Sequence, residues 1–472
     1  MTIQKGSLQR SLGLLSCVVL VISAIIGSGV FKKVAPMSES LQVPGWVLAA
    51  WVLAGFISLF GALSNAEIAG MFAGSGGEYT YFKKIYNPFF AFLYGWGSFA
   101  AIRSASIASI AYVFAESLNH LIKLPAIGSD FSILWGLKPF DNLTIKLIAA
   151  TLLVVLTFIN YKGLKLGENV SRTLTFTLVI AILFLIITGL FNSNASWTNI
   201  TTASSNYIPN AVGKSGFLAL LFTAMLGAFW AYEGWNNIGY LGGEIKNPQR
   251  NIPLSLFIGV IIVMSIYFLL NFVYHFNSPI DDIITRQKTG SGIAAVDIVG
   301  IYLGKTGALF ISCLILVTTL NATNATILMA SRIYFAMGRD GYFFKKTEFV
   351  HPRYKTPSYA LWIQCAWSVI LLFSGSFDQL TDMLIFASFL FYGATAFGVF
   401  VMRKKAPDLE RPYKVIGYPF VPAIFVLFCL GLFIYTPSQR PVEAGIGILL
   451  ILTGIPFYLY WKKNNITSDT SD

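Results

Sequence analysis

The chain is poor in charge. Of its 472 residues only 11% are Asp, Glu, Lys or Arg, while 56% are hydrophobic. A soluble domain carries about 25% charged residues, so the composition excludes an ordinary soluble protein and indicates an integral membrane protein. We expect no cleavable signal peptide, because the first apolar run is long enough to span a membrane and ends without a small-x-small site.

Cysteine and histidine are also scarce. The four cysteines all lie in apolar segments without a CxxC pair, and the three histidines lie at segment ends or in loops. This pattern indicates neither a disulfide framework nor a metal site, and we expect no cofactor. A membrane-embedded enzyme, which needs a convergent nucleophile, metal or acid–base pair, stays only as a distant alternative. A channel is not favoured either, because no filter repeat or charged ring is visible.

The formal net charge of +12 does not indicate nucleic-acid binding. The basic residues lie mainly in short loops between apolar runs, which is the pattern that sets orientation in a lipid bilayer. Alternate loops and the N-terminus carry 21 of the 33 Lys and Arg residues, and the other side carries 10. This excess predicts a multi-pass protein of the cell membrane with both termini in the cytoplasm.

A membrane-spanning helix needs about 20 apolar residues. Runs of this kind number twelve and lie at about 12–34, 44–70, 89–118, 143–160, 169–191, 215–241, 253–274, 296–330, 358–375, 380–402, 416–436 and 443–461. The sequence therefore predicts an all-α membrane protein with twelve transmembrane helices. The polar end, 462–472, is expected to be a disordered cytoplasmic tail.

The first run is interrupted at its centre by the sequence IIGSGVF, residues 25–31. Each Gly in a helix interior costs about 1 kcal/mol relative to Ala. Small residues in membrane helices often serve close packing, but that favours a spacing of four, and Gly27 and Gly29 are two apart. The stretch therefore favours a broken helix that offers backbone groups to a polar solute.

The sixth run is interrupted as well, by WAYEGWNN at 230–237. Interrupted segments at matching places in two halves of a chain indicate a transporter binding site. Since the two lie five runs apart, the second unit is inverted relative to the first. We expect a first repeat at 1–191, a second at 215–402 and two further spans at 416–461.

Two broken helices can bind an α-amino acid without any side-chain acid or base. The half-helix that starts near Ser28 presents free N–H groups and a positive dipole end, which suit a carboxylate. The half-helices that end near Ile25 and near Trp230 and Ala231 present free carbonyls, which suit an ammonium group. This arrangement predicts transport of an amino acid substrate rather than catalysis.

The residues at 25–31 resemble the first-helix motif of the amino acid–polyamine–organocation superfamily, and the whole chain looks like its L-type amino acid transporter family. The further matching stretches are 61–67 (GALSNAE), 75–79 (SGGEY), 231–253 (AYEGWNNIGYLGGEIKNPQRNIP), 331–341 (SRIYFAMGRDG) and 407–413 (PDLERPY). The resemblance implies a LeuT-like five-plus-five inverted repeat with two additional C-terminal helices. It also implies sodium-independent amino acid transport, usually by exchange.

The resemblance also implies roles for individual residues. Backbone around Gly27, Ser28 and Gly29 would hold the substrate carboxylate. The amino group would meet carbonyls near the ends of the two broken halves, at Ile25, Trp230, Ala231 and Glu233, with Gly234 at the break. Trp230 falls where the family places an outer gate, and Asn236 matches a family asparagine near the site.

Three departures from the family pattern limit what can be carried over. Glu233 falls where transporters of large neutral substrates carry a small residue; it is either a ligand for an ammonium group or a locally paired structural acid. Leu178 stands where many relatives hold a buried lysine. The loop at 120–142 lacks the cysteine with which animal members bond a heavy chain, so no disulfide-linked partner is expected.

Other polar residues within the spans have open roles. Arg103 is either a gating or coupling residue or a structural tie to a carbonyl or acid. Asn321 either lines the pathway or belongs to a hydrogen-bonded seam between helices. Glu67 and Glu244 are expected to be structural ties.

The sequence thus favours exchange of neutral L-amino acids by alternating access. Proton-coupled uptake of cationic amino acids or polyamines through Glu233 is the alternative.

Overall fold

A computed structural model describes residues 8–125, 127–128, 140–193, 195–207, 214–289, 293–374, 377–439 and 441–469. Within these ranges the chain is almost wholly helical, and two isolated β-bridges pair Leu12 with Ile245 and Ser75 with Leu241. The helices are, in chain order, α1 (Leu14–Ile25), α2 (Gly29–Lys32), α3 (Val34–Leu41), α4 (Pro44–Met71), α5 (Glu78–Ile85), α6 (Pro88–Gly97), the π-helix η1 (Ser98–Ile102), α7 (Arg103–Leu121), α8 (Leu143–Tyr161), α9 (Leu164–Leu190), α10 (Trp197–Thr201), α11 (Lys214–Tyr232), the 3₁₀ helix η3 (Trp235–Tyr240), α12 (Pro248–Asn277), α13 (Ile280–Thr289), α14 (Ala294–Arg339), the 3₁₀ helix η4 (Lys345–Glu348), α15 (Ser358–Ser374), α16 (Phe377–Lys405), α17 (Phe420–Gln439), α18 (Pro441–Leu452) and α19 (Gly454–Asp469).

Eleven helical segments in the described part of the chain are long and apolar enough to cross a membrane. They coincide with eleven of the twelve predicted runs. The remaining run, expected at 358–375, is α15, which is apolar but only 17 residues long. The prediction of a nearly all-helical membrane protein is confirmed at this coarser level.

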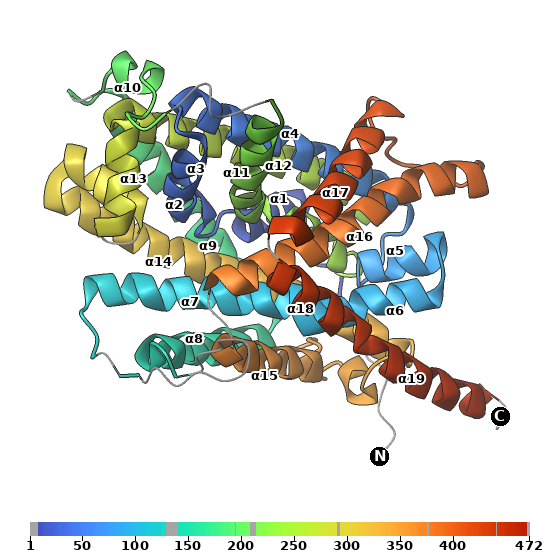
Figure 1. Ribbon diagram of the computed structural model, residues 1–472. Coiled ribbons are helices and arrows are strands. Elements are labelled where there is room, and N and C mark those ends of the chain that lie inside the picture. The colour runs from blue at the N-terminus through green and yellow to red at the C-terminus, as the bar shows by residue number, and fades with distance from the viewer. Residues whose placement is uncertain are drawn as a thin grey trace.

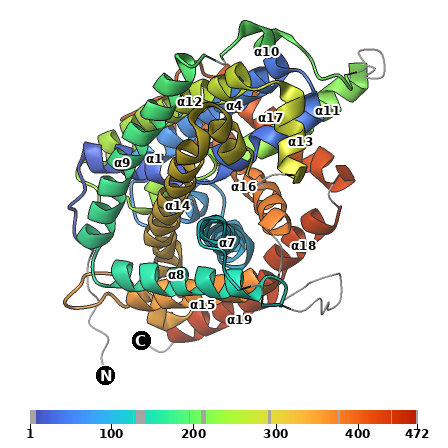
Figure 2. The same cartoon turned by 90° about the vertical axis from the view of Figure 1, so that its left-hand side faces the viewer.

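The helices pack around α7. In Figure 1, α7, α8, α14 and α15 run across the view, and Figure 2 looks along α7 and shows it surrounded by other helices. The segment Pro88–Asn119 is 89% buried over its apolar window. Its many Ala and Ser residues allow this enclosure, because small side chains let neighbouring helices approach closely.

Ion pairs on buried carboxylates join distant parts of the chain. Glu67 on α4 accepts hydrogen bonds from Arg403 Nε at 3.0 Å and Nη2 at 2.7 Å, and from the Val415 N–H. Glu244 accepts from Arg332 on α14 at 2.8 and 2.9 Å. The prediction that both glutamates are structural ties is confirmed.

Helix α19 begins in the last apolar run and continues to Asp469, within the polar stretch 462–472 that is expected to form the tail. A helix that has started in an apolar segment extends at little cost per residue, because nucleation is the expensive step. Residues 470–472 lie outside the described part of the chain.

Replacing Glu67 with Ala should lower the free energy of unfolding by about 3 kcal/mol, because it leaves Arg403 and a backbone N–H without their acceptor. Denaturant unfolding of the purified protein in detergent measures this. The matched control is Lys83→Ala, which removes a partly exposed pair with Asp340 and should cost less than about 1 kcal/mol. Equal losses in the two variants would contradict the assignment.

Candidate functional site

The first predicted interruption is present. Helix α1 ends at Ile25, residues 26–28 are not helical, and α2 begins at Gly29. Ser28 precedes α2 without making a side-chain cap, and its Oγ is buried without a hydrogen-bond partner among the described residues. The first N–H groups of a helix have no partner within it. The break thus presents polar groups that a ligand can satisfy.

The second interruption is present as well. Helix α11 ends at Tyr232, Glu233 and Gly234 form a turn, and η3 begins at Trp235. Gly234 has φ of +112°, in the left-handed region that side chains rarely adopt. The broken sixth span therefore depends on this glycine.

The two breaks contact each other through glycines. A Cβ at Gly29 would lie 2.5 Å from the Cα of Ala231, and a Cβ at Gly234 would lie 2.5 Å from the carbonyl oxygen of Ala24. No side chain fits at either place. The backbones of two segments some 200 residues apart are thereby held against each other.

A small cavity of about 20 Å³ lies between the breaks. This is close to the space that one water molecule needs. Seven of the predicted site residues line it: Ile25, Gly27, Ser28, Gly29, Trp230, Glu233 and Gly234. The remaining lining residues are Ala24, Ser106, Ile110, Asn237, Ala322 and Thr326. The side chain of Asn237 is buried, and neither its oxygen nor its nitrogen is hydrogen bonded to any described residue.

Two predicted site residues lie just outside this lining. Ala231 packs against Gly29, and its carbonyl accepts a hydrogen bond from the hydroxyl of Tyr267 on α12 at 2.9 Å. The same hydroxyl lies 3.0 Å from the carbonyl of Ile25. A carbonyl oxygen has two lone pairs, so each keeps capacity for a second donor. Tyr267 therefore bridges the ends of both broken halves.

Asn236 lies behind the cavity in a buried polar network. Arg103, at the start of α7, donates from Nη1 to Glu233 at 2.9 Å and from Nη2 to Asn236 at 3.2 Å. Nη2 also donates to the hydroxyl of Tyr392 on α16 at 2.7 Å, and that hydroxyl lies 2.6 Å from the Glu233 carboxylate. Glu233 thus has a cation and a hydroxyl as partners.

The network continues to Glu78, the first residue of α5, outside the candidate spans. Its carboxyl accepts from the side-chain amides of Asn236 at 2.7 Å and Asn65 at 2.9 Å. Burial raises the pKa of this carboxyl, and the hydrogen bonds from the amides oppose that shift. The start of α5 is thereby tied to the second break.

Asn321 lies in a different place. Its amide nitrogen donates to Thr175 on α9 at 2.9 Å and to Ser23 on α1 at 3.3 Å. The Ser23 and Thr175 hydroxyls are themselves 2.5 Å apart. The structure places Asn321 in a hydrogen-bonded seam of three helices, outside the cavity lining.

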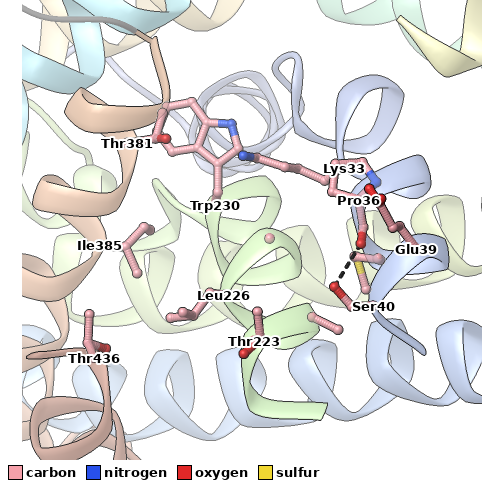
Figure 3. Close-up of a pocket in the computed structure, with 13 residues that line it drawn as sticks. Lys33, Pro36, Glu39, Ser40, Thr223, Leu226, Trp230, Thr381, Ile385 and Thr436 are labelled. Carbon is pink, nitrogen blue, oxygen red and sulfur yellow. Dashed lines mark hydrogen bonds between the residues drawn. The ribbon is translucent and has the colours of Figure 1, made fainter. Parts of the chain in front are cut away.

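A second, larger cavity of about 260 Å³ shares Trp230 with the first. It is lined by α3, the middle of α11, α16 and the end of α17. In Figure 3 the indole of Trp230 lies at one end of this cavity, with Thr381 beside it and the Lys33 side chain extending toward it. Trp230 therefore lies in the wall of both cavities.

The other end of the bundle, where α1 begins, is closed by backbone pairing. Leu12 accepts from the Lys246 N–H at 2.8 Å, and Ser11 and Leu12 donate to the carbonyl of Glu244. The Gly76 N–H donates to the carbonyl of Tyr240 at 3.1 Å. We call this end the N-terminal face and the end with the larger cavity the opposite face.

The broken helices, the enclosed polar groups and the run of spans fit a known family, and the sequence matches it. Residues 12–456 match the model of the amino acid permease family. The chain belongs to the amino acid permease family. The resemblance inferred from the motifs is confirmed.

Similar curated proteins agree with this assignment. The chain is 31% identical to the serine/threonine exchanger SteT of Bacillus subtilis, over 98% of both chains. It is 30% identical to the mouse b(0,+)-type amino acid transporter 1, over 97% of this chain and 89% of that one. It is also 30% identical to the human cystine/glutamate transporter, over 98% of this chain and 87% of that one. These relatives are transporters, so this permease is not an enzyme.

Several residues of the site were missed from the sequence. The sequence does not single out Tyr267 or Tyr392, because a tyrosine in an apolar span is typical of a residue that only packs against its neighbours. Glu78 belongs to the SGGEY stretch that supported the resemblance, yet it received no role. An acid next to two glycines near a span end was the available sign of a tied loop.

Gly29→Ala should reduce transport by this permease strongly, because the added methyl overlaps the backbone of Ala231 and forces the breaks apart. Gly445→Ala on α18 is the control, since nothing lies within 4 Å of its added Cβ. Uptake by reconstituted vesicles with equal amounts of inserted protein should be about tenfold or more lower for Gly29→Ala than for Gly445→Ala. Similar activities would contradict the contact between the breaks.

Proposed function

We propose that this permease is a sodium-independent exchanger of neutral L-amino acids that works by alternating access in the cell membrane. With α15 counted as a ninth span, the chain has twelve spans, arranged as five-plus-five inverted repeats with two additional helices. The pairing of two interrupted segments, the first and the sixth, supports this arrangement.

The observation that carries the proposal is the pair of opposite polar ends around the small cavity. The start of α2 and the Ser28 hydroxyl suit a carboxylate. The carbonyls of Ile25 and Ala231 suit an ammonium group, which would take the place of, or add to, the Tyr267 hydroxyl. An α-amino acid carries both groups on one carbon atom, so one molecule can satisfy both ends.

Neutral substrates are favoured by the state of Glu233. The alternative, proton-coupled uptake of cationic amino acids or polyamines, needs this carboxylate to be available. In the structure it is engaged by Arg103 and Tyr392. The hydroxyls and amides nearest the cavity, on Ser28, Ser106, Asn237 and Thr326, suit a small polar or apolar side chain.

Exchange is supported by the relatives. One of them, which is 31% identical over 98% of both chains, is named as a serine/threonine exchanger. Sodium independence accords with the seam of Ser23, Thr175 and Asn321, which holds α1 against α9 and α14 through neutral groups that hydrogen bond to one another.

Alternating access is supported by the unequal closure of the two faces. Backbone pairing joins segments at the N-terminal face, while on the other side Trp230 lines both the small cavity and the larger one. With both termini in the cytoplasm, as the excess of basic residues suggests, the larger cavity faces the exterior. Without a cysteine at 120–142, the permease would act without a disulfide-linked heavy chain.

Proteoliposomes preloaded with unlabelled serine or alanine should take up labelled serine at least about tenfold faster than empty vesicles, because an exchanger returns across the membrane only when loaded. Replacing external sodium with choline should leave the rate unchanged. Equal rates with loaded and empty vesicles would contradict exchange, and a loss of uptake in choline would contradict sodium independence.

A further inference from the structure

Arg103 occupies an unusual position for a charged residue. It begins α7, the central enclosed helix, directly after the π-helical segment Ser98–Ile102. Its side chain is 1% exposed, and its Nε has no hydrogen-bond partner within the described residues. A π-helical turn shifts the register of the residues that follow and often occurs at functional sites. Here it precedes a guanidinium that points at the second break.

The pair of Arg103 and Glu233 is asymmetric with respect to the cavity. Glu233 belongs to the cavity lining, whereas Arg103 does not. The guanidinium holds the carboxylate from behind, together with the Tyr392 hydroxyl. The cavity wall therefore carries a carboxylate whose charge is balanced within the protein.

The pairing of Arg103 with Glu233 affects how strongly the cavity attracts a cation. A buried carboxylate without a partner is costly, and a cation supplied by a ligand would remove that cost. With Arg103 in contact, the same ligand would meet a carboxylate already neutralised and a like charge behind it. The guanidinium thus weakens the attraction of the cavity for a second positive charge.

We propose that Arg103 is a specificity-determining residue that neutralises Glu233, so that the permease excludes amino acids with cationic side chains. This inference rests on the proposed transport of amino acids. Removing the guanidinium alone would leave the Glu233 carboxylate in the cavity wall as a partner for an additional ammonium group, as carried by lysine or ornithine.

The test compares labelled lysine with labelled alanine in counterflow at pH 8. Arg103→Met keeps much of the apolar volume and removes the charge, and the ratio of lysine to alanine uptake should rise about tenfold or more. Arg103→Lys restores a cation and should keep the ratio near that of the unmodified permease. The double variant Arg103→Met, Glu233→Gln should lose the gain.

Arg332 provides a matched control. It is also 1% exposed and pairs with a buried glutamate, Glu244, but this pair lies at the N-terminal face and not at the cavity. Arg332→Met should disturb folding or gating without raising the lysine-to-alanine ratio. A rise in this variant as large as in Arg103→Met would mean a general loss of selectivity and would overturn the proposal.

An Arg103→Met permease that exchanges alanine without any gain in lysine also overturns it. If this variant does not reach the membrane, Glu233→Gln tests the same charge pair by removing the carboxylate instead of the guanidinium. The unbalanced guanidinium should then make external glutamate inhibit alanine uptake about tenfold more strongly, and unchanged inhibition overturns the proposal.

A binding measurement separates this inference from the proposed function. Lysine should raise the unfolding temperature of purified Arg103→Met in detergent, and it should not do so for the double variant. If the unmodified permease exchanges no amino acid, the proposed function fails, while this shift still decides the role of Arg103. Absence of the shift in folded Arg103→Met overturns the inference.

Discussion

The close approach of the two interrupted segments is the constraint on which the site depends. At Gly29 and at Gly234 the two backbones approach each other so closely that a side chain would not fit between them. Unwound backbone at membrane depth is tolerated only where protein or an enclosed cavity surrounds it. The packing of α7, α12 and α14 supplies this enclosure, and Tyr267 joins the carbonyl ends of both breaks.

Charged side chains inside the bundle also join distant segments. Four arginines with carboxylate partners, Arg103, Arg332, Arg403 and Arg411, hold segments that are far apart in the sequence. Breaking one such pair by removing a partner is costly, so each is a durable tie. Only Arg103 lies at the second break, where its tie also sets the charge that the cavity presents.

The sequence predicted the elements of the fold that depend on composition and local pattern. Apolar runs gave eleven of the spans, and the Gly-rich and acidic interruptions located both breaks, because these are local departures from an apolar helix. Seven of the predicted site residues meet around one cavity. Their roles in binding stay predictions, since no ligand contact tests them.

What the sequence could not give depends on contacts between distant segments. Glu233 could be either a ligand or a locally paired acid, because its pairing with Arg103 joins residues 130 positions apart. The roles of Tyr267 and Tyr392 were hidden for the same reason. Polar composition alone likewise does not show where a helix that began in an apolar segment, such as α19, will stop.

The two faces of the bundle are held by contacts of different kinds. At the N-terminal face these include the pairing of Leu12 with Ile245, the Gly76 hydrogen bond to Tyr240 and the buried Arg332–Glu244 pair. At the opposite face, Trp230 lines both cavities, and the partly exposed Lys32–Glu116 pair joins α2 to α7. The proposed alternating access requires these two sets of contacts to separate in turn. The N-terminal set joins three segments through backbone hydrogen bonds, so those segments must move together when that face opens.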